Sequence, residues 1–222
     1  MIQGYSLLFS WYFFEPNSSL SVFMGMNAEI RAVSAAEIED EIWDLLKSGA
    51  SNHKSAFHTA TIATVGDTFP FIRTVVLRAA NREEKSLRFH TDIRSPKIQH
   101  LEKNPNISWL FYDKELRIQV RIKAQASIHI SDEVAEMAWE QSRVSAKMCY
   151  TTTGGPGTLI EAPELIQFNV AEMSIEDETF ARSNFAVVLS TIQAMDVLFL
   201  HHSGHKRFLI DYEKGLQSWV QV

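Results

Sequence analysis

The spacing of apolar residues predicts an amphipathic helix over residues 34–47. Ser34 and Glu37 stand three apart, as in a capping box at the start of a helix, and Gly49 is expected to end it. We expect this helix to pack on the body of the protein from outside, because its apolar residues recur at helical spacing on one face. Those residues are Ile38, Ile42, Leu45 and Leu46.

After this helix the pattern changes to runs of β-branched and aromatic residues separated by short polar turns, which is typical of strands. The runs predict a mainly β protein with flanking helices, in which six or seven antiparallel strands form a split β-barrel. Closure is expected because it removes exposed strand edges. The predicted strands are 59–65, 69–79, 86–91, 106–112, 116–130, 185–200 with a break inside, and 207–212. A helix over 131–141 is expected to turn Val134, Met137 and Ala138 inward.

Length and composition favour one domain over residues 27–222. Residues 1–26 contain no Lys or Arg, so they lack the basic segment of a secretory signal. We interpret them as an arm packing on the body or a partner, or as an over-called start with translation beginning at Met24 or Met26. Their apolar stretch is too short to span a membrane.

The chain carries a formal net charge of −6, which argues against nucleic acid or an anionic membrane as a partner. Cys149 is the one cysteine, so no intramolecular disulfide can form. A reducing, cytoplasmic location is expected, with Cys149 as a small buried residue.

Residues 91–105 have the features of an anion site. Ser95 is a suitable N-cap, Pro96 suits the first helical position, and Asn104-Pro105 would end the helix. Its first N–H groups would lie beside Arg94 and Lys97, which is how proteins often bind phosphate. The alternative is a capped helix whose basic residues are solvated.

Arg73 and Arg78 lie in an apolar strand, where burial is costly unless the guanidinium meets an anion. They are five residues apart and would point to opposite faces of a regular strand. One ligand could use both only if the strand bulges or ends near Arg78. Otherwise the two side chains extend to water at the strand edge.

From about Ala56 onward, the chain resembles the pyridoxamine 5′-phosphate oxidase-related family of flavin mononucleotide (FMN) binding split barrels. An ordered series of motifs carries this resemblance. Arg73 to Arg78 is similar to the family's R-x-V-L-L-K, Phe89 to Lys97 to F-Y-T-N-x-x-S-R-K, and Leu116 to Arg121 to L-x-R-Q-V-R. Further matches are Asn104-Pro105, Ser142-Arg143 with Ser145, and His205 to Phe208.

The resemblance implies a homodimer that binds FMN and a small anionic or phosphorylated molecule. The cofactor-binding residues it implies are Arg73, Thr74, Val75, Arg78, His90, Thr91, Ser95, Lys97, Gln119 and Arg207. The substrate-binding residues it implies are Arg78, Trp139, Arg143, Ser145 and His205. His205 and Arg207 would be catalytic.

Several positions depart from the family pattern and indicate a divergent branch. Pro96 replaces an arginine that contacts FMN, His90 replaces a tyrosine, and Met195 stands at the place of a tryptophan that stacks on the flavin. Trp139 replaces a tyrosine and Ser203 an arginine near the substrate, so we expect weak or absent pyridoxamine 5′-phosphate oxidation.

Three functions remain open at this stage. The first is an FMN-dependent oxidoreductase, the second a flavin-binding protein without robust turnover, and the third a split barrel that uses haem or a deazaflavin. The histidines at 201, 202 and 205 fit no common zinc pattern, and no metal is expected. The glycine-rich stretch 154–157 lacks the lysine of a phosphate-binding P-loop, so we expect a flexible loop that borders the site.

Overall fold

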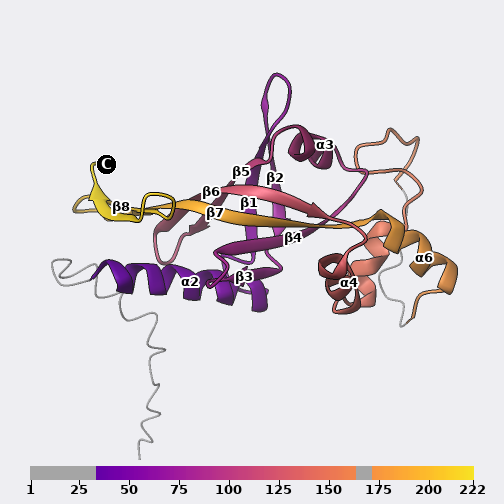
Figure 1. The fold of residues 1–222 in the computed structure, drawn as a ribbon, viewed down its shortest axis with the longest axis horizontal. Helices are drawn as coiled ribbons and strands as arrows, with labels where there is room; N and C mark the ends of the chain where they lie inside the picture. Colours follow the sequence, from indigo (N-terminus) through magenta and orange to yellow (C-terminus); the bar gives the residue numbers. More distant parts are fainter. Residues whose placement is uncertain (1–33, 164–171) are drawn as a thin grey trace, which may run out of the picture.

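The computed structural model describes residues 34–163 and 172–222. Its strands are all antiparallel and form one sheet, which curls into a half-barrel as predicted (Figure 1). The strand order is β2-β1-β5-β6-β7-β4-β3, and β8 pairs with β7 and with β9. The strands are β1 Thr59–Val65, β2 Pro70–Val76, β3 Ala79–Asn81, β4 Ser86–Asp92, β5 Asn106–Asp113, β6 Ile118–His129, β7 Phe185–Phe199, β8 Lys206–Asp211 and β9 Leu216–Val220.

The longest strand, β7, organises this sheet. Along one edge it pairs with β6, and along the other its first half pairs with β4 and its second half with β8. The predicted break within 185–200 is wrong. The strand is continuous, and the pairing with β6 shifts by one residue near Gln193, so a β-bulge replaces the break.

The described residues hold nine strands, so the predicted six or seven is too few. The run 69–79 divides into β2 and β3, with Leu77 and Arg78 between them. Strand β9 was not predicted. Its five residues, Leu-Gln-Ser-Trp-Val, do not alternate between apolar and polar, and its pairing with β8 is not visible from local sequence alone.

Helix α2, Ala35–Ser51, lies against the sheet at β3, and its N-terminal capping box is present as predicted (Figure 1). The expectation that Gly49 ends this helix is wrong, because the helix continues to Ser51. A Cβ at Gly49 would lie 2.5 Å from the backbone oxygen of Phe57. Glycine is therefore needed for close approach of helix and chain rather than for termination.

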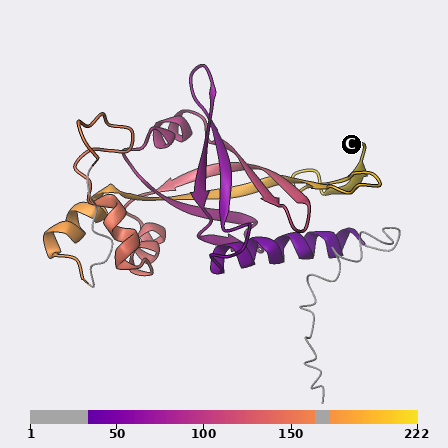
Figure 2. The ribbon, with the colours of Figure 1, turned by 180° about the vertical axis from the view of Figure 1, so that it is seen from behind.

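The other helices gather at the far end of the sheet, except α3, Pro96–Lys103, which lies near the β1–β2 hairpin (Figures 1 and 2). The far group comprises α4 Glu133–Glu140, α5 Val144–Lys147, a 3-10 turn Met148–Tyr150 and α6 Ile175–Asn184. Val134 and Ala138 face inward on α4 as predicted, but Met137 is exposed. Ala135 and Trp139 take the inward face instead, beside Phe185.

Two apolar clusters hold these elements together. The larger fills the half-barrel and includes Ile38, Ile42 and Leu46 of α2, each fully buried. The smaller joins α4 and α6 to the start of β7. Among the described helices, none is long and apolar enough to cross a membrane. The predicted arm, residues 1–26, lies outside the described residues.

Candidate functional site

Lys97, in the first turn of α3, is held between two hydroxyl groups. Its Nζ donates to Ser95 Oγ at 2.6 Å and to Thr91 Oγ1 at 2.9 Å. Burial, together with the positive charge of Arg73, lowers the pKa of Lys97 to about 8. The Ser95 side chain makes no hydrogen bond to the helix backbone, so it serves this ammonium group and not the cap.

Arg73, on β2, lies near Lys97 on the inner face of the sheet, the face that encloses the larger apolar cluster. Its Nη1 donates to the buried Thr64 Oγ1 at 2.6 Å, and that hydroxyl lies 3.1 Å from His100 Nδ1 on α3. Burial lowers the pKa of the Arg73 guanidinium. Within residues 34–163 and 172–222, no carboxylate forms an ion pair with Arg73 or Lys97. Two desolvated cations with adjacent hydroxyls form a site that suits a phosphate.

Arg94, expected to add charge beside the same helix, is already neutralised. It forms a two-point ion pair with Asp92, with nitrogen–oxygen distances of 2.9 and 2.6 Å. Its Nη1 also donates to the backbone oxygen of Thr152. A Cβ at Gly155 would lie 2.7 Å from the Arg94 Cβ, so the glycine-rich loop packs directly on this arginine. The loop therefore lies next to the segment that carries Ser95 and Lys97.

A second group of the predicted residues lines a cavity of about 690 Å³ on the other side of β4. Arg78, His90, Arg143 and Ser145 all line it, together with Arg88, which was not predicted. Strand β2 ends at Val76, before Arg78. The end of the strand is one of the two conditions under which one ligand could use both arginines, but Arg78 lines this cavity and Arg73 does not.

His90 is kept neutral in this cavity. Burial, and then the charges of Arg88 and Arg78, lower the pKa of His90 to about 3. Cys149 also lines the cavity and is exposed, so its expected burial is wrong. Although the residue is exposed as a whole, partial burial of its sulfur raises the pKa of the Cys149 thiol.

Trp139 does not line this cavity. It is buried between Tyr150 and Phe185, with ring centroids 6.3 and 5.2 Å away, and Lys147 Nζ lies 4.7 Å from its ring centroid. The structure thus separates Trp139 from Arg78 and Arg143, with which the resemblance grouped it.

Gln119 and Arg207 lie on the outer face of the sheet. Both pair with Leu198 of β7, from β6 and β8 respectively, and residues paired in this way point to the same face. Arg207 donates to Asp196 Oδ1 at 2.9 Å and Oδ2 at 2.7 Å. Burial would raise the pKa of Asp196, but hydrogen bonds from Arg207 and Arg121 hold it below its ordinary value.

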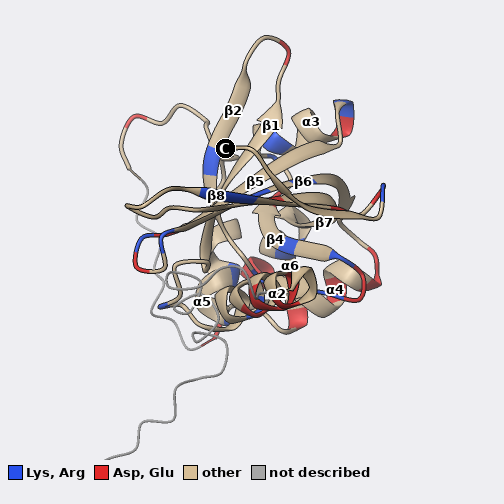
Figure 3. Ribbon diagram, turned by 90° about the vertical axis from the view of Figure 1, so that its left-hand side faces the viewer, with Lys and Arg blue, Asp and Glu red and all other residues tan. Residues whose placement is uncertain are grey.

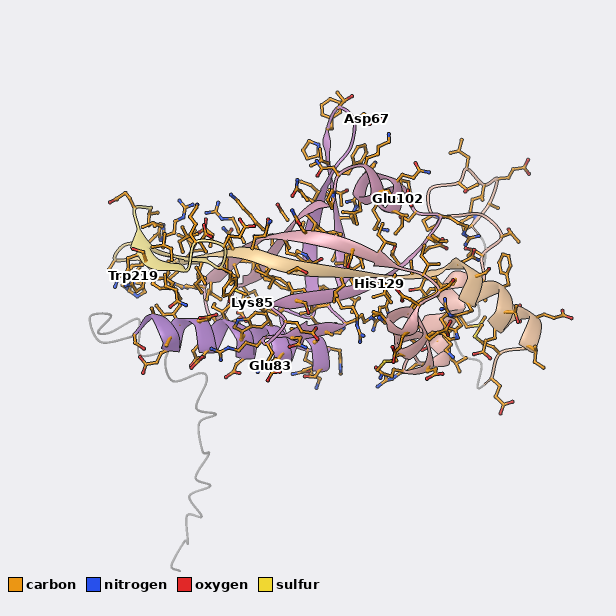
Figure 4. The ribbon with its side chains drawn as sticks, viewed as in Figure 1. Asp67, Glu83, Lys85, Glu102, His129 and Trp219 are labelled. Carbon is orange, nitrogen blue, oxygen red and sulfur yellow. The ribbon has the colours of Figure 1, made fainter. Side chains whose placement is uncertain are left out.

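His205 lies just before β8, where its Nδ1 is 3.3 Å from the backbone nitrogen of His201. Trp219 marks this end of the molecule, and His129, next to α4, lies toward the opposite end (Figure 4). His205 and Arg207 are therefore not assembled with Arg143 within one chain.

Three apolar side chains are exposed on the same outer face. Ile72, Leu110 and Tyr112 are 68%, 36% and 51% exposed. A cavity of about 710 Å³ on this face includes Ile72, Leu110 and Arg207 in its lining. Of the two β2 residues predicted beside Arg73, Thr74 lies on this outer face and Val75 packs on the core.

Comparison with known proteins agrees with this fold. Residues 40–130 match the family model described as pyridoxamine 5′-phosphate oxidase, FMN-binding domain. A pyridoxine/pyridoxamine 5′-phosphate oxidase of Zymomonas mobilis is 34% identical over 97 residues, covering 44% of this chain and 48% of that protein. The match thus spans about half the length of this curated relative.

Residues 40–130 of the chain are thus similar to the FMN-binding domain of the pyridoxamine 5′-phosphate oxidases. A pyridoxamine 5′-phosphate oxidase-related, FMN-binding protein of Nostoc punctiforme has the same fold, with a TM-score of 0.63 and 21% identity over 86% of this chain and all of that one. PhzG of Burkholderia lata, solved in complex with tetrahydrophenazine-1-carboxylic acid, has a TM-score of 0.61 and 14% sequence identity. That match covers 87% of this chain and 94% of PhzG. At these identities the structural likeness concerns the fold.

Sequence reasoning missed three members of these sites. Thr64 and Arg88 are ordinary residues of predicted strands, and Asp196 lies within a run predicted to be broken. For Thr64, which is fully buried, a signal was available: it is a polar residue at a strand position that faces the buried side of the sheet.

Proposed function

We propose that the protein binds FMN and holds its phosphate between Arg73 and Lys97, with Thr91 and Ser95 as further partners. The observation that carries this proposal is the pair of desolvated cations without a carboxylate partner in the described chain. The donor set fits the group, because a phosphate accepts hydrogen bonds from guanidinium, ammonium and hydroxyl groups at once. The first N–H groups of α3 add to this set.

We also propose that two copies of the chain form each flavin site. Gln119 and Arg207 lie on the outer face of the sheet, and Lys97 with Arg73 on the inner face. A second copy packed on Ile72, Leu110 and Tyr112 would bury an apolar patch and bring its own Gln119 and Arg207 to the flavin. Static light scattering should give twice the 25.3 kDa chain mass. A monomer at micromolar concentration would refute the shared site.

The proposed reaction is oxidation of a small anionic or phosphorylated substrate. Bound FMN supplies the capacity to accept a hydride, and the chain supplies binding and orientation. Arg78, Arg143 and Ser145 would hold the anionic group of the substrate in their shared cavity, which contains no acidic side chain among its lining residues. His205 and Arg207 of the second copy would approach the substrate from the outer face.

The first test is the absorption spectrum of the purified protein, followed by an FMN titration. One FMN per chain is expected, with a flavin spectrum and quenched flavin fluorescence. A colourless protein that leaves FMN fluorescence unchanged would refute cofactor binding. If the purified protein releases a haem or a deazaflavin, the scaffold binds that cofactor in place of FMN.

The second test concerns turnover. We expect weak or absent oxidation of pyridoxamine 5′-phosphate, because Ser203 supplies no positive charge and Trp139 lies outside the cavity. Pyridoxal 5′-phosphate should still bind the FMN-loaded protein, and Arg143→Ala should weaken that binding. Efficient pyridoxamine 5′-phosphate turnover would contradict the expectation. If the protein binds FMN but oxidises no small anionic substrate, we would assign it as a flavin carrier or sensor.

A further inference from the structure

The cavity beside β4 is more strongly cationic than one phosphate group requires. Three guanidinium groups line it, those of Arg78, Arg88 and Arg143, and its lining contains no Asp or Glu. In the described part of the chain, no carboxylate forms an ion pair with any of the three. Arginine stays protonated in proteins, so these charges must be balanced by water, solute ions or a ligand.

The inner wall of the cavity is formed by β4. Arg88 and His90 are two residues apart on this strand and therefore face the same side. Both are only partly exposed, and Arg88 Nε and His90 Nε2 are buried without a hydrogen-bond partner in the described chain. The backbone N–H of Arg78 donates to the oxygen of Arg88 at 2.8 Å, so these two arginines are neighbours. Buried polar nitrogens without a partner are rare in folded proteins, and their place in a cavity wall indicates that a ligand completes them.

The outer rim of the same cavity has a different character. Arg143 and Ser145 belong to the loop and helix after α4, and both are exposed. The cavity volume of about 690 Å³ exceeds what one phosphate group fills and suits a small organic molecule. One anionic group at the rim would leave the guanidinium of Arg88 at the inner wall without a partner.

We propose that this cavity selects a ligand with two separate anionic groups, a phosphate held at Arg143 and Ser145 with Arg78, and a carboxylate held at Arg88. This inference rests on the proposed function, which places the anionic substrate in this cavity, and adds the second charged group. Arg88 is then a specificity-determining residue. A planar guanidinium can bind a carboxylate through two parallel hydrogen bonds, and His90, held neutral, can add one more.

The experiment compares two probes that share one phosphate and one three-carbon skeleton. 3-Phosphoglycerate carries a carboxylate where glycerol 3-phosphate carries a hydroxymethyl group. Isothermal titration of the full chain, with FMN added in excess, should give at least tenfold tighter binding of 3-phosphoglycerate. Arg88→Gln should remove this difference and leave the affinity for glycerol 3-phosphate within about threefold. Arg143→Gln should weaken the binding of both probes.

Two further variants control for structure and charge. Arg82→Gln removes an exposed arginine that pairs with Asp40 near the start of β4, and it should leave both affinities unchanged. Arg88→Lys keeps the charge but not the two-point geometry, so it should retain part of the preference for the carboxylate. Its use keeps the test valid if Arg88→Gln does not fold.

Equal affinities of the natural chain for the two probes would overturn the proposal, as would no detectable binding of either at 10 mM. An equal loss of affinity for both probes in Arg88→Gln would also overturn it, because Arg88 would then not distinguish the carboxylate from the hydroxymethyl group. FMN titrations of the same proteins separate this result from the proposed function. Arg73→Ala should lose FMN but keep the probe preference, and Arg88→Gln should keep FMN affinity within about twofold.

Discussion

Arg73 Nη1 donates a 2.6 Å hydrogen bond to the Oγ1 of Thr64, which is fully buried on the adjacent strand. Thr64 in turn lies within hydrogen-bonding distance of His100 on α3. This chain of contacts ties the position of the guanidinium to both the hairpin and the helix that carry the phosphate site. The acidic residues, by contrast, concentrate on helices such as α2, away from this inner face (Figure 3).

Arg73→Ala should weaken FMN binding by about 2–4 kcal/mol, because a charge-assisted contact of the guanidinium with the phosphate is lost. Fluorescence quenching titrations measure the change. Arg82→Ala, which removes an exposed arginine, serves as the control and should change the dissociation constant by less than twofold.

Thr64→Val should have a smaller effect on FMN affinity, about 1 kcal/mol, because it removes the hydroxyl that orients Arg73 but not the charge. The same titration applies. An effect as large as that of Arg73→Ala would mean that Thr64 itself contacts the ligand.

FMN affinity should fall as pH rises through about 8. The free protein holds the pKa of Lys97 near 8, below its ordinary 10.5, and the phosphate is already fully ionised above pH 7. A bound dianion favours the charged ammonium group, so deprotonation of Lys97 opposes binding. The linkage predicts about tenfold weaker binding at pH 9 than at pH 7.

Lys97→Arg supplies the matched variant for this pH dependence. Because arginine does not titrate in this range, its FMN affinity should stay within about threefold from pH 7 to pH 9. The same steep loss in both proteins would assign the titration to another group.

Glu41, on the buried side of α2, should make stability depend on pH. Burial, with the charges of Asp44 and Asp40, raises its pKa to about 7 from an ordinary 4.5. A group with a raised folded-state pKa favours folding most below pH 4.5, and this contribution is lost as pH rises through 7. Glu41→Gln should therefore stabilise the protein by about 1–3 kcal/mol at pH 8 and change little at pH 4.5. Urea unfolding at the two pH values measures the difference. Asp44→Asn removes one of the charges that raise the Glu41 pKa, so it should reduce the pH dependence only in part.

Gly49→Ala should destabilise the protein although alanine is the better helix former. The added Cβ would meet the backbone of Phe57, and such crowding costs about 1–3 kcal/mol. The midpoint of thermal unfolding measures this effect. Ser48→Ala, on an exposed position of the same helix, should leave the midpoint unchanged or raise it.

Local signals in the sequence identified the capped helix α2, the short helix at Ser95-Pro96 and most strands, because capping residues and residue periodicity act over a few positions. The same holds for the Lys97 cluster, whose members lie within one strand–turn–helix segment. Strand β9 and the role of Gly49 depend on contacts with distant segments, and no local pattern reports those.

The candidate residues after position 200 show the same limit. His205 and Arg207 were grouped with Arg143 by resemblance, but the register of β8 on β7 places them at another end of the sheet. Sequence order and motif spacing do not state which copy of a chain supplies a residue. A site shared between copies leaves the same motifs in one sequence as a site built within a single chain.

Strand β7 also constrains how the protein can form during synthesis. Its residues pair with β4, about a hundred positions earlier, as in the Arg88–Leu189 pair, and also with β6 and β8. While the ribosome is still completing the chain, four strands can already pair in the order β2-β1-β5-β6, but one edge of β6 remains unpaired until residues 185–199 emerge. Such non-local pairing slows folding and leaves an unpaired strand edge that can associate with other chains. A nascent chain stalled before β7 is therefore the stage at which a molecular chaperone would matter most.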